Sequence, residues 1–81
     1  MNNTSEVINQ ILVAVLGPDI ASLQPDGILM DSLDSWDSMR HLSIIAALEN
    51  EFGIFIEASE AQELISYNQL IAFINNHPEI D

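Results

Sequence analysis

The chain has 81 residues, which predicts one small domain spanning residues 1–81, and 48% of the residues are apolar, too many for a disordered chain. Thirteen acidic residues stand against a single basic residue, Arg40, and the formal net charge of −12 excludes nucleic acid and argues against anionic membrane surfaces as partners. The absence of cysteine excludes disulfides, thiolate metal sites and thiol nucleophiles, and the two distant histidines lack the spacing of metal ligands.

The first predicted element is an amphipathic helix over residues 4–16. Its apolar residues follow the spacing of one helical face and are Val7, Ile8, Ile11, Leu12, Val15 and Leu16. The pair Gly17-Pro18 is typical of a helix end and predicts where this helix stops.

Residues 17–36 predict a long loop, because glycine and proline interrupt them repeatedly. A short helical turn is compatible with residues 19–23. Apolar residues in the loop are expected to tie it to the core, and these are Ile20, Leu23, Ile28, Leu29 and Leu33. Trp36 is expected to be a packing anchor at the end of the loop.

The second strongly periodic segment predicts a helix over residues 37–52. Its apolar stripe is about 100° wide and consists of Ile44, Ile45, Leu48 and Phe52, with Leu42 at its edge. Gly53 is typical of the residue that follows a helix. We interpret His41 as an incidental residue of this helix.

The remaining sequence predicts two more helices. Residues 54–56 form a short apolar connector without an evident partner strand, and Phe55 is assigned to the core. Residues 57–64 favour a short helix. The pattern Ser66-x-x-Gln69 is a capping box that starts a last amphipathic helix, which ends by Pro78. The predicted fold is all-α, with three main helices, one short helix and a long first loop.

Sequence motifs argue against an enzyme or a membrane protein. The chain contains no glycine-rich phosphate loop, no H-E-x-x-H and no G-x-S-x-G motif. No apolar run approaches the ~20 residues of a membrane span, and the first residues lack the basic region of a secretory signal. We therefore expect a cytoplasmic carrier or binding module, and we expect it to be a monomer.

One serine, Ser38, lies at the start of the helix predicted over residues 37–52. In one interpretation Asp37 or Ser38 is only a helix N-cap. In another, Ser38 carries a phosphate group, which would face unpaired backbone N–H groups and the positive end of the helix dipole. Many helices share this feature, so it does not decide between the two.

The wider pattern is more specific. Asp37-Ser38-Met39 opens the helix, and the acidic end of the helix contains Phe52, fourteen residues after Ser38. With the first helix, the long loop and the acidic balance, this pattern resembles the acyl carrier protein family over nearly the whole chain. The upstream tripeptide Asp31-Ser32-Leu33 has the wrong spacing to Phe52, and Ser35 fails in the same way. We therefore assign the modified serine to Ser38, flanked by Asp37 and Met39.

The resemblance implies a carrier and not an enzyme. In the family, a phosphopantetheinyl transferase attaches 4′-phosphopantetheine from coenzyme A to the serine, here Ser38, with the help of magnesium. The thiol at the end of this arm carries an acyl group as a thioester. Acyl-loading and acyl-accepting enzymes are the further partners, and their basic patches bind the acidic second helix.

The sequence departs from the family at that recognition surface. Fatty-acid carriers usually have an acidic and then a small polar residue where Arg40 and His41 stand, and often Glu where Ser43 stands. The departure predicts altered partner choice and a specialised pathway, although Arg40 is equally compatible with simple pairing to a nearby carboxylate. The residues expected to take part in partner recognition are Met39, Arg40, Ser43, Glu49 and Glu51.

Two alternative functions stay open at this point. The cargo could equally be an aminoacyl or peptidyl group, although the Gly-Gly-x-Ser motif of peptidyl carriers is absent before Ser38. In a non-covalent interaction module, Ser38 would be only a helix cap and the acidic face would be the binding surface.

Overall fold

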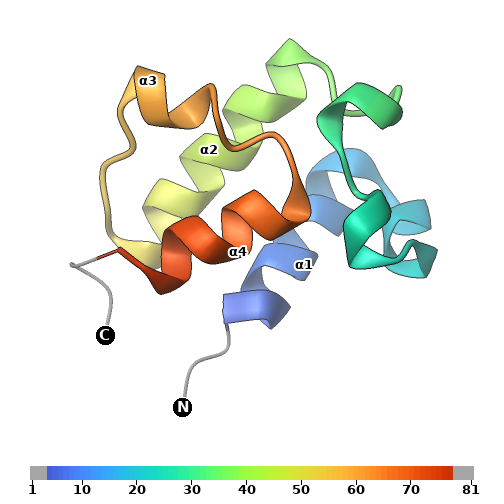
Figure 1. The fold of residues 1–81 in the computed structure, drawn as a ribbon, viewed down its shortest axis with the longest axis horizontal. Coiled ribbons are helices and arrows are strands. Elements are labelled where there is room, and N and C mark those ends of the chain that lie inside the picture. Colours follow the sequence, from blue (N-terminus) through green and yellow to red (C-terminus); the bar gives the residue numbers. More distant parts are fainter. Residues whose placement is uncertain (1–3, 78–81) are drawn as a thin grey trace.

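The computed structural model describes residues 4–77, which form four α-helices and three 3-10 helices (Figure 1). The α-helices are α1 (Thr4–Leu16), α2 (Ser38–Phe52), α3 (Ala58–Ala61) and α4 (Tyr67–Asn75). The 3-10 helices are η1 (Pro18–Ser22), η2 (Pro25–Gly27) and η3 (Met30–Ser32). Within the described range there is no strand, only an isolated antiparallel bridge between Leu29 and Ser66. The predicted all-α fold is therefore confirmed.

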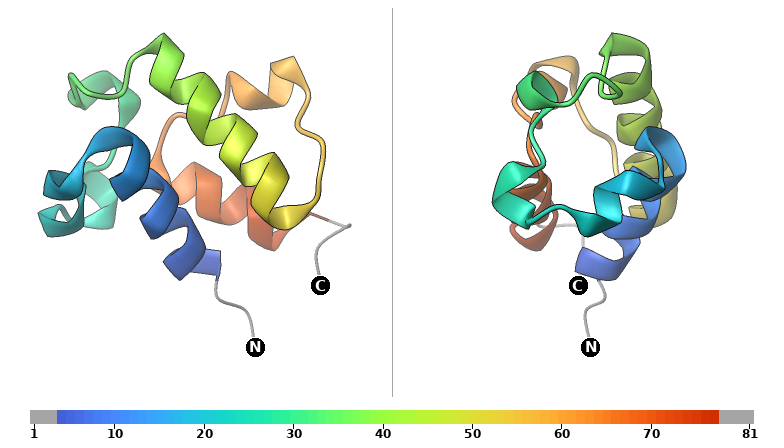
Figure 2. Two further views of the ribbon diagram at one scale, coloured as in Figure 1. Left: turned by 180° about the vertical axis from the view of Figure 1, so that it is seen from behind. Right: turned by 90° about the vertical axis from the view of Figure 1, so that its right-hand side faces the viewer.

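The core lies where α1 packs against α2 and α4. Seen from behind, α2 runs diagonally across the molecule beside α1 (Figure 2). Two side chains from each of these three helices are fully buried, and they are Ile8, Leu12, Ile44, Leu48, Leu70 and Ile74. Full burial of a side chain of this size contributes about 1.5–3 kcal/mol, so the predicted apolar stripes are what hold the bundle together.

The helix ends follow local signals that the sequence shows. Gly17 has a positive φ of 111°, which a side chain would disfavour, and its N–H donates to the Val13 carbonyl at 2.9 Å. At the start of α4, Ser66 Oγ accepts from the Gln69 N–H at 3.1 Å, and Gln69 Oε1 accepts from the Ile65 N–H at 3.2 Å. Ser66 is thus the N-cap of α4, as predicted, but the reciprocal bond of a capping box is not formed, because the Gln69 side chain accepts from Ile65 and not from the Ser66 N–H. Pro78 lies outside the described residues.

Backbone hydrogen bonds join the segment between α1 and α2 to the residues around the start of α4. The Met30 N–H donates to the Ile65 carbonyl at 2.9 Å, and the Tyr67 N–H donates to the Ile28 carbonyl at 3.0 Å. Ile28 is buried, whereas Leu29 is 38% exposed, because neighbouring side chains of an extended backbone point to opposite sides.

The other apolar residues of this segment were expected to pack against the core, and only some of them do. Ile20 is buried within η1, which confirms the short helical turn, and Leu33 is half-buried. Leu23 is 39% exposed, so the expectation that Leu23 and Leu29 tie the loop to the core was wrong.

The connector between α2 and α3 also corrects the sequence analysis. Ile54 and Ile56 are buried, but Phe55 between them is 72% exposed, so its assignment to the core was wrong. Here too the alternation of an extended chain decides which side chains point inward. Leu42, expected at the edge of the buried stripe, is 67% exposed, and α3 is shorter than the helix predicted over residues 57–64.

Candidate functional site

The first turn of α2 is capped by Asp37. Its Oδ1 accepts from the Arg40 N–H at 2.9 Å, and its backbone carbonyl accepts from the His41 N–H at 2.8 Å. At the other end of α2, Gly53 adopts the left-handed conformation with φ 65°, as its position in the sequence predicts. Asp37 is therefore the N-cap, and Ser38 is the first residue of the helix.

Ser38 is exposed, and its hydroxyl has no hydrogen-bond partner among residues 4–77. The first N–H groups of a helix have no acceptor within the helix. The side-chain and backbone oxygens of Asp37 accept from the N–H groups of Arg40 and His41. The N–H groups of Ser38 and Met39 therefore have no acceptor in the described part of the chain and face solvent. A free hydroxyl thus lies beside the positive end of the helix dipole, where an anionic group is favoured.

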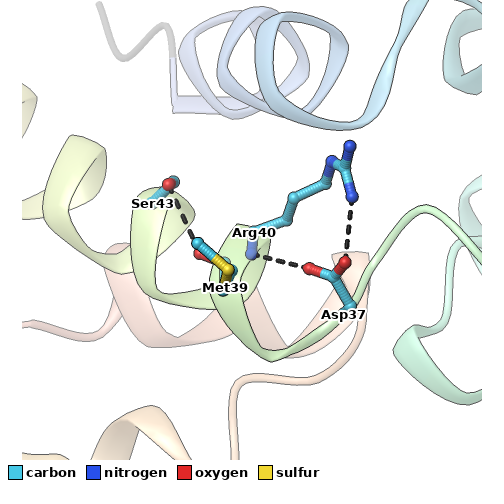
Figure 3. A network of polar contacts seen from close by, with 4 residues as sticks. All are labelled: Asp37, Met39, Arg40 and Ser43. Atoms are coloured by element: carbon cyan, nitrogen blue, oxygen red, sulfur yellow. Dashed lines mark hydrogen bonds and ion pairs between the residues drawn. The ribbon is translucent and has the colours of Figure 1, made fainter.

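Arg40 pairs with the capping carboxylate. Its Nη1 lies 2.9 Å from Asp37 Oδ2, and the two side chains are about half exposed, at 49% and 52% (Figure 3). An ion pair this exposed contributes about 0–1 kcal/mol to stability. Arg40 is the single basic residue of the sequence and stands two positions after Ser38, and the pair offsets the charge of Asp37.

Met39 and Ser43 form the outward face of this turn. Met39 is 79% exposed, and the Ser43 hydroxyl donates to the Met39 carbonyl at 3.3 Å. An open surface depression of about 280 Å³ is lined by Asp37, Met39, Arg40 and Ser43. Figure 3 shows these four side chains. The structure therefore brings four of the sequence-predicted site residues together next to Ser38.

The two glutamates of α2 lie elsewhere. Glu49 is half-buried, and its Oε2 accepts from the Ile56 N–H at 2.8 Å, so it fastens the connector that follows α2. Glu51 is exposed and lines a depression between α1 and α2 beside Ala47. Neither carboxylate lies in the depression beside Met39.

The alternative serines have different surroundings. Ser32 is exposed but ends the three-residue 3-10 helix η3. Ser35 is half-buried in the turn before Trp36. Neither begins an α-helix.

His41 has a structural role that the sequence analysis missed. The Trp36 Nε1–H donates to His41 Nδ1 at 3.0 Å, and His41 Nε2 lies 2.8 Å from the Ala61 carbonyl oxygen. Trp36 is 2% exposed, which confirms it as a packing anchor. The interpretation of His41 as incidental was wrong, and no sequence signal identifies a backbone carbonyl twenty residues away as its partner.

Across residues 4–77, no three histidine or carboxylate side chains gather closely enough to hold a metal ion. In the same range, no helix has the length and apolar character that a membrane span requires.

The chain is similar in sequence to known acyl carrier proteins. The acyl carrier protein of Solidesulfovibrio magneticus is 35% identical over 72 residues, which cover 89% of this chain and 91% of the relative. Those of Nitratidesulfovibrio vulgaris and Thermosynechococcus vestitus are 31% and 32% identical, cover 91% of this chain, and are themselves covered to 96% and 94%. The chain belongs to the acyl carrier protein family. No family model and no solved structure matches it.

Membership of this family defines the kind of protein. Acyl carrier proteins are carriers without catalytic activity, so the chain is not an enzyme. The family typically bears 4′-phosphopantetheine on a serine and works with a phosphopantetheinyl transferase and acyl-handling enzymes. For this acyl carrier protein, the exposed first turn of α2 is the candidate attachment site.

Proposed function

We propose that Ser38 is the serine of this acyl carrier protein that bears 4′-phosphopantetheine, and that residues 1–81 work as one carrier domain. The supporting observation is that the Ser38 hydroxyl is exposed, has no partner among residues 4–77, and begins a helix of 15 residues. Ser32 and Ser35 do not combine these properties.

The charges around Ser38 fit a phosphodiester. The N–H groups of Ser38 and Met39 are available as donors, and the helix dipole favours a negative group at this end. Asp37 would repel the phosphate, but its carboxylate is already paired with the Arg40 guanidinium and N–H. Attachment joins Ser38 Oγ to the phosphorus of the arm. The phosphoanhydride bond of coenzyme A breaks, adenosine 3′,5′-bisphosphate leaves, and the hydroxyl proton is lost.

The arm supplies a thiol, which this cysteine-free chain lacks, to hold an acyl group as a thioester. The chain presents the arm and its acyl group to the partner enzymes. Helix α2 holds Ser38 at its exposed end, and Met39 and Ser43 form the adjoining surface. We propose that the transferase and the acyl-loading and acyl-accepting enzymes contact this surface.

We further propose that Arg40 directs this carrier to a specialised biosynthetic pathway in the cytoplasm. Partners of the family bind an acidic second helix through basic patches. The positive charge of Arg40 beside Ser38 repels such a patch. The acidic residues of α2 do not compensate, because Glu49 bonds to Ile56 and Glu51 lies on the α1 side.

Intact mass measurement tests the proposal on Ser38. The protein, produced without a transferase, is incubated with coenzyme A, Mg²⁺ and a broad-specificity phosphopantetheinyl transferase. We expect a gain of one phosphopantetheine in the wild type and in Ser32→Ala, and no gain in Ser38→Ala. Ser38→Ala should remain folded because Asp37 caps the helix, and circular dichroism checks this. A folded wild type that gains no mass, or a loaded Ser38→Ala, contradicts the proposal.

A further inference from the structure

Two hydrogen bonds meet at His41, about one turn after Ser38. The Trp36 Nε1–H lies 3.0 Å from His41 Nδ1, and the Ala61 carbonyl oxygen lies 2.8 Å from His41 Nε2. An indole N–H can only donate and a carbonyl can only accept. His41 must therefore accept at Nδ1 and donate at Nε2, and only the neutral Nε2–H tautomer does both.

These bonds join three segments of the chain. Trp36 ends the segment that precedes α2, His41 belongs to α2, and Ala61 is the last residue of α3. The rings of Trp36 and His41 are tilted against each other, with ring centroids 5.9 Å apart and planes inclined by 33°. Because α3 has only four residues, it cannot be stable by itself, and its position depends on contacts such as the one to His41.

We propose that His41 is a positioning residue that, as its Nε2–H tautomer, couples α3 and Trp36 to the turn of α2 that begins with Ser38. The consequence for loading rests on the proposed function of Ser38, whereas the coupling itself exists in the chain before any group is attached. The bond to Ala61 holds α3 against the first part of α2, and the bond from Trp36 holds the segment that precedes Ser38 against the same histidine. Loss of a bond populates other arrangements, and the apparent affinity of a partner falls with the fraction of the competent one.

Asparagine and glutamine separate the two bonds. In His41→Asn the amide oxygen stands near the position of Nδ1, so the acceptor for Trp36 is kept and the donor to Ala61 is lost. In His41→Gln the amide nitrogen reaches the position of Nε2, so the donor to Ala61 is kept and the acceptor for Trp36 is lost. Ser66→Ala is the matched control, since it removes the cap of α4 and touches neither bond.

NMR spectroscopy of the unloaded protein tests the coupling directly. Long-range ring correlations should identify the Nε2–H tautomer of His41. Trp36 is the single tryptophan, so its indole N–H signal is unambiguous, and it should move upfield in His41→Gln but not in His41→Asn. The Gln62 amide, which donates to the Ala58 carbonyl, should exchange about fivefold faster in His41→Asn, the factor for one net hydrogen bond.

Loading kinetics test the consequence for Ser38. With the same broad-specificity transferase, we expect His41→Asn to raise the KM for the carrier by up to about fivefold with kcat unchanged. Ser66→Ala should lower Tm and change neither constant. A general loss of stability would not produce this split, because the folded fraction stays close to one in both variants.

The outcomes separate the coupling from the proposed function. An Nδ1–H tautomer, an indole signal that ignores His41→Gln, or a KM that His41→Asn leaves unchanged would overturn the coupling. If the wild type does not load at all, the proposal for Ser38 fails, and the NMR measurements still decide whether His41 couples the three segments.

Discussion

Three Asp-Ser sequences follow one another at intervals of three residues in this chain, and the surroundings of the first and the last differ. The upstream one, Asp31-Ser32-Leu33, overlaps the three-residue helix η3, whereas the downstream one, Asp37-Ser38-Met39, begins the 15-residue helix α2. Both serines are exposed, so exposure does not distinguish them. The long helix does, because its free N–H groups and its dipole favour an anionic group at Ser38. The tripeptide is a candidate site only together with the helix that follows it.

The largest effect is expected at Trp36, which lies directly before the downstream sequence. Trp36→Ala should lower the free energy of unfolding by about 3–5 kcal/mol, because the ring is 2% exposed and donates to His41. Denaturation in urea, followed by circular dichroism, measures this. Leu29→Ala is the control within the upstream segment and should cost much less at 38% exposure. Equal losses would show that Trp36 does not anchor the boundary.

A smaller difference in the free energy of unfolding is expected between variants of Asp31 and Asp37. Asp37→Ala should lower the free energy of unfolding by about 1 kcal/mol, because the Arg40 N–H loses its capping acceptor. Asp31 caps no helix in the described structure, so Asp31→Ala should stay within about 0.5 kcal/mol of the wild type. Thermal and urea denaturation of the pair measure both values. If the two losses are the same, the downstream sequence has no special helix start.

Arg40 is expected to affect partners more than stability. Arg40→Gln should cost at most about 1 kcal/mol, because the ion pair is half exposed. It should lower the KM for the carrier of an enzyme that docks through a basic patch, more strongly at low salt than at high salt. Gln62→Glu makes the same change in net charge on the exposed end of α3 and is the control. Equal shifts in KM would mean that net charge, and not the place of Arg40, governs docking.

The smallest effect on stability is expected at the two serines themselves. Neither hydroxyl caps a helix in the described residues, so Ser32→Ala and Ser38→Ala should each change the free energy of unfolding by no more than about 0.5 kcal/mol. Urea denaturation of both variants checks this. A loss near 1 kcal/mol in Ser38→Ala alone would instead indicate a capping role and favour a non-covalent interaction module.

Much of the fold was predictable because it depends on local sequence. The periodicity of α1 and α2 gave their bounds to within one residue, and Ser66-x-x-Gln69 marked the start of α4. The position of Ser38 at a helix start was predictable for the same reason. In these cases the residues that decide the structure lie within a few positions of one another.

Other features were not predictable because they depend on contacts between distant segments. Whether Leu29 or Phe55 points inward depends on how an extended connector lies against the core, and both were assigned to the wrong side. The partner of His41 is a backbone carbonyl on α3, and a carbonyl leaves no mark in the sequence. Glu49 was predicted as a recognition residue, but its bond to the Ile56 N–H depends on the path of the connector.

The most direct test of the central claim uses the aspartates themselves. An aspartate stands directly before each candidate serine, so cleavage on the N-terminal side of aspartate leaves Ser32, Ser35 and Ser38 on separate peptides. Mass spectrometry of the digested, loaded wild type then shows which peptide bears the group. The account predicts 4′-phosphopantetheine only on the peptide that begins at Asp37. The group on the peptide that begins at Asp31 or Asp34 would contradict it.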